Sequence, residues 1–288
     1  MRVYVIMGGT GHVGSAVAKT LLGRGEAVTI VTRDADRASV WRANGAEIAE
    51  ASVEDVASLR AALRRGRRAF LLNPSADPAT DTDAVERRTV ANILSALQGS
   101  GLEKVVAQST GGAQPGERIG DLSVLWEFEQ GLRRQSIPAA INRGAYYMSN
   151  WDGVLDTVRS TGKLPTMFAA DLNIPMVAPS DLGEVAAARL LSSVDDTAVR
   201  ELEGPKRYTS ADVARAFSKA LGRPVEVDVT PRDKWKDAFR RLGFSEVAAE
   251  SYARMTAVSV DSGFKSSDDP LRGATTLDAY IRNLVDGS

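Results

Sequence analysis

Hydrophobic and polar positions change their period repeatedly along the first half of the chain. Short apolar runs rich in β-branched residues alternate with stretches whose apolar residues recur every three or four positions, the pattern of amphipathic helices. The predicted strands are 3–7, 27–31, 47–51, 69–72, 104–108 and 139–142. The predicted helices are 12–24, 35–44, 54–65, 80–100 and 122–136. This alternation predicts an α/β fold, a doubly wound parallel sheet with helical crossovers.

The rhythm changes after about residue 150. Helices are predicted at 152–161, 181–194 and 210–221, a strand at 225–229, and mostly helical stretches at 231–256 and 275–286. The stretch between the first two helices is irregular and contains Pro165 and Pro175. We therefore predict a sheet domain at 1–150, to which 176–195 returns. Residues 151–175 and 196–288 are predicted to form a smaller C-terminal α/β lobe.

A glycine-rich loop joins the first predicted strand to the first predicted helix. It spans residues 8–14 and contains G-x-G-x-x-G at Gly9, Gly11 and Gly14. Glycines allow the backbone to approach a pyrophosphate closely, and the helix N-terminus then offers N–H groups and a positive dipole end. The loop predicts a Rossmann-type dinucleotide-binding domain. The residues predicted to hold the phosphates are Gly8, Thr10, Gly11, His12, Val13 and Gly14.

The end of the second predicted strand bears on which nucleotide is bound. NAD enzymes commonly carry an acidic residue at this strand end to hold the ribose hydroxyls. Thr32 stands there instead, and Arg33 follows it with a guanidinium group suited to a 2′-phosphate. Asp34 keeps NAD as the alternative. The pattern favours NADP.

Composition narrows the function classes further. The chain is 43% hydrophobic and 25% charged, and its net charge of −1 points to neither a nucleic-acid nor a membrane partner. It has no cysteine, which excludes disulfides, thiolate metal sites and a cysteine nucleophile and is typical of a cytoplasmic protein. His12 is the single histidine, so we expect no metal site. The first strand begins within a few residues of Met1, and we expect no signal peptide.

Together with the loop and Arg33, four later stretches give the chain a resemblance to a known family. They are residues 70–74, 105–110, 142–150 and 174–183. In this order they are similar to the NmrA-like family of atypical short-chain dehydrogenases/reductases, with Gly144 where that family usually has proline. The resemblance covers roughly residues 1–285.

The resemblance implies where the two ends of the cofactor lie. Residues at the ends of the fourth, fifth and sixth strands would line the nicotinamide and substrate pocket. By position these are Leu72, Asn73, Pro74, Ser109, Thr110, Gly144, Ala145 and Tyr146. Ser52 and Val53 stand where the family often has an aspartate for the adenine amino group, which implies a weaker or different contact there.

The chemistry usual in this superfamily is missing from the helix after the fifth strand. A Tyr-x-x-x-Lys pair normally supplies the proton there, since the lysine lowers the tyrosine pKa. Asp121 and Leu125 occupy the corresponding positions, and Glu129 matches a glutamate found in related quinone reductases. We expect Glu129 to act behind the site or on the helix surface. Tyr146 and Tyr147 are candidate catalytic residues, as proton donors or as walls that stack on a flat substrate.

Three functions follow as hypotheses. The first is an NAD(P)H-dependent oxidoreductase that passes hydride directly to a quinone or similar small conjugated acceptor. The alternative is a non-catalytic NAD(P)-binding redox sensor with a regulatory protein partner, motivated by the missing Tyr-Lys pair. A sugar-nucleotide epimerase is weakest, because it needs the same missing tyrosine. The expected partner is a small molecule, and a homo-oligomer is compatible with the sequence.

Overall fold

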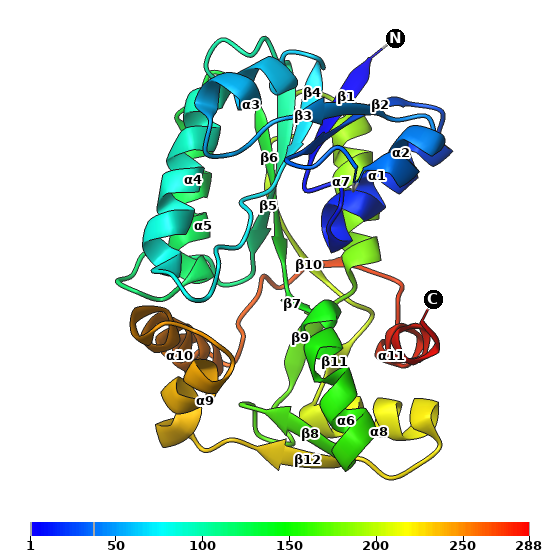
Figure 1. Cartoon of the computed structure of the whole chain (residues 1–288), viewed down its shortest axis with the longest axis vertical. Helices are drawn as coiled ribbons and strands as arrows, with labels where there is room; N and C mark the ends of the chain where they lie inside the picture. The colour runs from blue at the N-terminus through cyan, green and yellow to red at the C-terminus, as the bar shows by residue number, and fades with distance from the viewer. Residues whose placement is uncertain (1, 37, 288) are drawn as a thin grey trace.

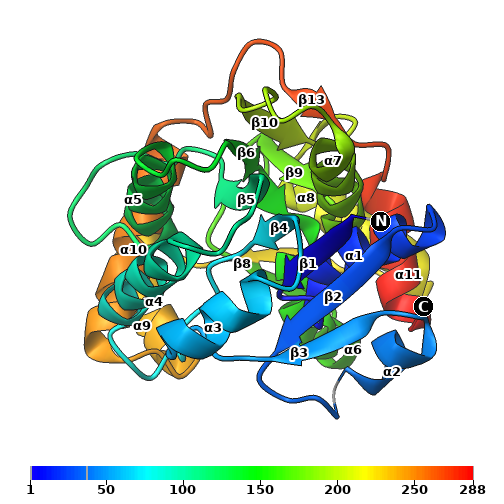
Figure 2. The same ribbon diagram turned by 90° about the horizontal axis from the view of Figure 1, so that it is seen from above.

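An eight-stranded sheet, parallel throughout, forms the centre of the larger part of the molecule in this computed structural model, which describes residues 2–36 and 38–287 (Figures 1 and 2). From one edge to the other its strands are β13 (Leu271–Arg272), β10 (Val199–Glu203), β6 (Ala139–Gly144), β5 (Lys104–Thr110), β4 (Arg68–Leu71), β1 (Val3–Met7), β2 (Ala27–Thr32) and β3 (Glu47–Glu50). The order reverses between β1 and β4, so a crevice is expected at the carboxyl ends of these strands.

Helices cover both faces of this sheet. On one face lie α1 (His12–Gly23) and α7 (Pro179–Leu191); on the other lie α3 (Val56–Leu63), α4 (Thr82–Leu97) and α5 (Asp121–Arg133) (Figure 1). The short helix α2 (Ser39–Ala43) lies beside β3. Each face has its own core of buried aliphatic side chains, as alternating strand residues require. The predicted Rossmann-type α/β fold is confirmed.

A smaller lobe lies below the carboxyl end of the sheet in Figure 1. Its elements are β7 (Tyr146–Tyr147), η1 (Met148–Val154), α6 (Leu155–Thr161), β8 (Lys163–Thr166), β9 (Ile174–Val177), β11 (Arg207–Tyr208), α8 (Ser210–Leu221), β12 (Glu226–Val229) and α11 (Leu277–Asp286). They enclose a third, aromatic-rich core. From β12 the chain runs through η2 (Arg232–Lys234) into a helical pair, α9 (Trp235–Arg241) and α10 (Glu246–Asp261), with α10 lying against α4.

The structure differs from the sequence expectations in the second half. The helical stretch predicted at 231–256 breaks at Gly243, whose φ of +90° ends α9, and Ser245 then caps α10. The irregular stretch around Pro165 and Pro175 holds two short strands, β8 and β9. Strands β10 and β13 fall in the range assigned to the lobe, yet they extend the main sheet beyond β6. These two strands were not predicted because they contain polar residues. The domain boundaries stay a prediction.

Helix α7 is fixed to the sheet by two cationic side chains, Lys104 and Arg189, at its C-terminal end. The Lys104 ammonium, fully buried, donates to the carbonyl oxygens of Arg189 and Ser193 at 2.9 and 2.7 Å. Arg189 forms a bidentate ion pair with Asp196. Arg189, Ser192 and Lys104 together lower the pKa of Asp196 to about 2. At its other end α7 contacts α1 where Gly183 faces Ala16. This contact fixes the place of the glycine loop's helix.

Candidate functional site

The glycine loop between β1 and α1 has no room for side chains. Gly8 has a φ of +66°, and a Cβ atom there would collide with Leu72. A Cβ on Gly14 would meet the Gly8 and Met7 backbone, with Met7 O at 2.8 Å. The Gly11 N–H donates to Gly8 O at 2.9 Å and closes the turn. The loop is therefore a tight backbone cradle at the carboxyl edge of the sheet.

The start of α1 offers donors to an anion. Its first bond runs from Ser15 N–H to Gly11 O, so the N–H groups before Ser15 have no partner within the helix. No side chain caps this end, and its first turn has no acidic residue. Thr10, Gly11 and His12 are exposed, whereas Val13 and Gly14 pack into the fold. The residues present fit a pyrophosphate.

The end of β2 places Arg33 in the solvent at the edge of this cradle. Its guanidinium makes no hydrogen bond or ion pair with any residue that the structure describes. The Asp34 carboxylate accepts the Asp36 N–H at 3.0 Å, and the Thr32 hydroxyl bonds to the Asp34 backbone. The acid of the NAD alternative is thus engaged in its own turn, while Arg33 is available.

His12 links the cradle to the smaller lobe. Its Nε2 lies 3.8 Å from Oδ2 of Asp152 in η1, and the imidazole is 65% exposed. The Tyr280 hydroxyl of α11 donates to the same carboxylate at 2.9 Å. Partial burial raises the pKa of Asp152. The lobe therefore contacts the start of α1 directly.

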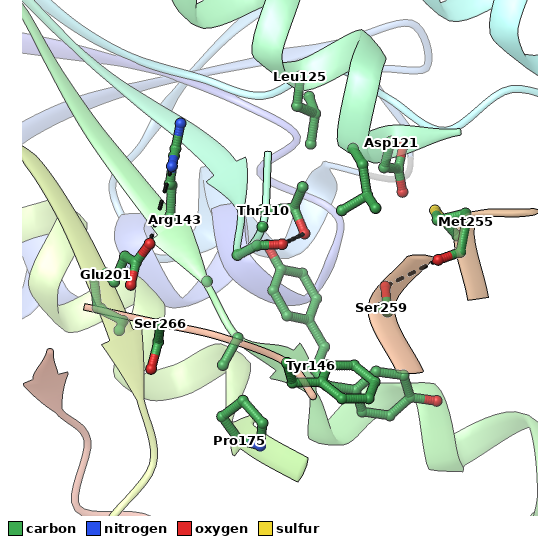
Figure 3. A pocket seen from close by; sticks show the side chains of 18 of the residues that line it. Thr110, Asp121, Leu125, Arg143, Tyr146, Pro175, Glu201, Met255, Ser259 and Ser266 are labelled. Carbon is green, nitrogen blue, oxygen red and sulfur yellow. Dashed lines mark hydrogen bonds and ion pairs between the residues drawn. The ribbon is translucent and has the colours of Figure 1, made fainter. Parts of the chain in front are cut away.

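A cavity of about 330 Å³ opens beside the cradle, within the range of small-molecule sites. Leu72 joins the two, because it lines the cavity and also touches Gly8. Figure 3 shows Asp121 and Leu125 of α5 on one side, Arg143 and Glu201 on the other, Met255 and Ser259 of α10 on a third, and Tyr146 with Pro175 below. We call this cavity the central pocket.

Seven of the residues predicted to bind the cofactor or act in catalysis line the central pocket: Leu72, Asn73, Thr110, Gly144, Ala145, Tyr146 and Tyr147. Pro74 and Ser109 are adjacent in sequence but are not among its lining residues. Ser52 and Val53 follow β3 at the same edge of the sheet, away from the pocket. The role of each in cofactor binding stays a prediction.

Ser109 differs from its expected place because side chains alternate along a strand. Gln108 and Thr110 line the pocket, whereas Ser109 is buried and donates to Glu129 at 2.6 Å. Glu129 is itself fully buried and holds Arg143 through two bonds of 2.8 and 2.7 Å. Glu129 is thus not on the helix surface; it lies behind the pocket and fixes the Arg143 guanidinium at its wall.

The two candidate tyrosines are half-buried and differ in their surroundings. The Tyr146 ring packs edge-on to Phe168, with centroids 5.3 Å apart, and burial raises its pKa to about 12. The Tyr147 ring fills the space left by Gly144, and burial together with the nearby Asp121 carboxyl raises its pKa. A lysine partner would lower these pKa values. Both hydroxyls are therefore weaker acids than free tyrosine, which suits walls better than proton donors.

Asp121 and Glu86 form a carboxyl pair at the pocket wall. Glu86 is only 2% exposed, accepts the Ala76 N–H at 3.0 Å, and lies in hydrogen-bond contact with Asp121. Burial and the adjacent acid raise the pKa of Glu86 to about 8, and burial raises that of Asp121. Asp121 stands at the superfamily's tyrosine position, where the sequence predicts no role for it. Glu86 carries no signal in the sequence, because only the packing of α4 on α5 brings it to the site.

Comparison with known proteins agrees with this architecture. The sequence pattern of the NmrA-like family matches residues 2–281. The chain belongs to the NmrA-like family. The NAD(P)H azoreductase of Xenophilus azovorans is 24% identical over 254 residues, 88% of this chain and 86% of that protein.

Two solved structures show the same fold over whole chains. The triphenylmethane reductase of Citrobacter sp. superposes with a TM-score of 0.82 at 20% identity, over 99% of this NmrA-like chain and 100% of that chain. The NADPH-dependent quinone oxidoreductase of Escherichia coli, complexed with NADPH, gives 0.81 at 20% identity over 98% and 99%.

Within residues 2–36 and 38–287, no group of three or more His, Cys, Asp or Glu side chains is arranged to hold a metal ion. In that same part of the chain, every helix is too short or too polar to cross a bilayer.

Proposed function

We propose that this NmrA-like protein is an NADPH-dependent reductase of a small, flat, conjugated acceptor such as a quinone. The observation that carries the proposal is the continuity between cradle and pocket. Leu72 touches the loop that fits a pyrophosphate and also lines a cavity large enough for a nicotinamide and an aromatic ring. When bound, the reduced nicotinamide supplies a hydride. The likeness to a quinone oxidoreductase and an azoreductase supports this substrate class.

Each part of the site has a role in this proposal. The α1 N-terminus and the glycine backbone hold the pyrophosphate, and Arg33 pairs with the 2′-phosphate. Leu72, Gly144 and Ala145 form the apolar bed against which the nicotinamide ring lies. The Tyr146 ring, supported by Phe168, forms the floor on which the acceptor stacks. Helix α10 closes the pocket from the side and excludes water.

The test is the steady-state oxidation of NADPH in the presence of benzoquinones and naphthoquinones. The protein should accelerate acceptor-dependent loss of NADPH absorbance well above the uncatalysed rate, and NADPH should be preferred over NADH. A panel without any enzyme-dependent turnover would contradict the proposal.

A non-catalytic redox sensor remains the second candidate, favoured by the raised pKa values of Tyr146 and Tyr147 and the lack of a Tyr-Lys pair. It predicts different affinities for NADPH and NADP+ without turnover. Calorimetric titration of both forms separates the two candidates, since equal affinities would argue against the sensor.

A further inference from the structure

Asp121 brings a carboxyl group to the wall of the central pocket, near the start of α5 (Figure 3). The preceding residue, Gly120, fixes the position of Asp121, because the Gly120 N–H donates to the Ser251 hydroxyl of α10 at 3.0 Å. The Asp121 side chain is half-buried, with one side toward the cavity and the other against Glu86.

The groups around this pair are mostly acidic. Asp83 of α4 is the next carboxylate; it accepts the Ser251 hydroxyl at 2.5 Å and pairs with Arg87 at 3.3 Å. Arg87 is also engaged by Glu127 at 3.0 Å. Two neutral hydroxyls, Tyr147 of β7 and Tyr252 of α10, complete the surroundings.

This arrangement keeps a proton on the pair. Among the described residues, no cation forms an ion pair with Asp121 or Glu86. Two like charges 4 Å apart repel by about 4 kcal/mol at an effective dielectric constant near 20. Two carboxyl groups in hydrogen-bond contact therefore share one proton rather than ionise together.

We propose that Asp121 is the proton donor of the central pocket and protonates a neutral conjugated acceptor as hydride reaches it. The inference rests on the proposed function and specifies its chemistry. Asp121 takes the place of the missing tyrosine at the pocket wall, and Glu86 is a positioning residue that shares its proton with Asp121.

The step balances with the reactants already named. A quinone gains one hydride, two electrons and a hydrogen, from the reduced nicotinamide, which is oxidised to NADP+. The Asp121 O–H bond breaks, and its proton forms the O–H bond on the quinone oxygen that has become negative. The product is the hydroquinone, and the Asp121–Glu86 pair, which has given up its one shared proton, regains a proton from water.

A second group in the pocket suits the product of this step. Gln108 is buried and lines the pocket, and its Nε2 donates to the carbonyl oxygens of Ser109 and Asn142 at 2.9 and 3.2 Å. Its orientation is thus fixed beside the Tyr147 hydroxyl, and among the described residues no donor meets its buried Oε1 at hydrogen-bond geometry. A buried acceptor without a donor is costly. The new O–H or N–H group of a reduced acceptor would satisfy it.

The test compares two hydride acceptors that differ in their need for a proton. A naphthoquinone needs hydride and a proton, whereas N-methylacridinium is a flat cation that becomes neutral on gaining hydride alone. Asp121→Asn should lower kcat with the naphthoquinone about 100-fold or more, the range of general acid catalysis. With N-methylacridinium, after subtraction of the uncatalysed rate, it should change kcat less than threefold. Glu117→Gln removes an exposed carboxyl from the loop before α5 and should change neither rate.

Two further measurements test the inference without the comparison of the two acceptors. For the wild-type protein, kcat with the naphthoquinone should fall as pH rises through about 8, where Glu86 loses its proton, and should show a solvent deuterium isotope effect. Infrared spectra of the free protein near neutral pH should show the carbonyl stretch of a protonated carboxyl group. That band should be lost or shifted in Asp121→Asn and in Glu86→Gln, and unchanged in Glu117→Gln.

The outcomes separate the two proposals. If the wild-type protein reduces neither acceptor, the proposed function fails. If it reduces both and Asp121→Asn slows both equally or neither, Asp121 is not the proton donor. Absence of the protonated carboxyl band from the wild-type spectrum would overturn the inference independently of turnover.

Discussion

At the scale of single residues, the sequence shows which groups are present but not which are neutral. Arg33 is identified by its place after a strand, because the nucleotide fold uses that position in a known way. In the sequence, Asp121 only marks the absence of the expected Tyr-Lys pair. Its pKa is raised by burial, which the local sequence does not show, and its contact with Glu86 joins residues 35 positions apart in the chain. The pocket-lining role of Gln108 follows from strand alternation and was within reach of the sequence, whereas the Asp121–Glu86 contact was not.

Arg33 should set the choice between the two cofactors. Arg33→Ala removes the guanidinium that we assign to the 2′-phosphate, so it should raise Kd for NADPH about tenfold or more and leave Kd for NADH nearly unchanged. Fluorescence titration of both cofactors measures the two effects. Arg24→Ala, which removes an exposed arginine from the far end of α1, is the control. An unchanged preference would remove Arg33 from the site.

Glu86 should make the stability of the protein depend on pH. Its pKa is raised from 4.5 to about 8, so its contribution to stability is complete below about 4.5 and is lost as pH rises through about 8. The wild-type Tm should therefore fall between pH 6 and pH 9. Glu86→Gln stays neutral, so its Tm should fall by several degrees less over that range. Glu117→Gln should follow the wild type, and a parallel decline in Glu86→Gln would contradict this assignment.

At the scale of elements, the contact between α1 and α7 positions the glycine loop. Gly183 of α7 lies against Ala16 and the Val17 backbone, and a Cβ there would stand 2.8 Å from Val17 N. The far end of α7 cannot move away, because Lys104 and Arg189 anchor it to the sheet. The sequence predicted both helices but gave no sign that they touch, since 166 positions separate Gly183 from Val17.

Gly183→Ala should therefore displace α1 and weaken the cradle. We expect a loss of stability of about 1–3 kcal/mol, the usual cost of an overpacked contact, together with weaker NADPH binding. Thermal unfolding and cofactor titration measure the two effects. Gly23→Ala is the matched control, because a Cβ at the last residue of α1 would meet no atom within 4 Å apart from its chain neighbours and its own helix backbone, and it should stabilise slightly. Equal behaviour of the two variants would show that the close approach has no consequence.

At the scale of the whole molecule, the first half of the fold is predictable and the second half is not. Strands β1, β2, β4 and β5 each contain a run of apolar residues because they are buried on both faces, and these runs allow the strands to be predicted from the sequence. Strand β10 carries Arg200, Glu201 and Glu203, and Glu203 pairs with the side chain of Arg272 from a distant segment. Its membership of the sheet is thus decided by contacts that no local pattern records.

The place of β10 has a consequence for dissecting the protein. Since β10 pairs with β6 along Ile141–Gly144, a fragment ending near residue 150 would leave the backbone of β6 unpaired at an open edge. Exposed edges of this kind template intermolecular pairing and aggregation. The nucleotide-binding half is therefore not a portable module: a chimera that borrows it must also carry residues 199–203, or supply a strand of its own to cover that edge.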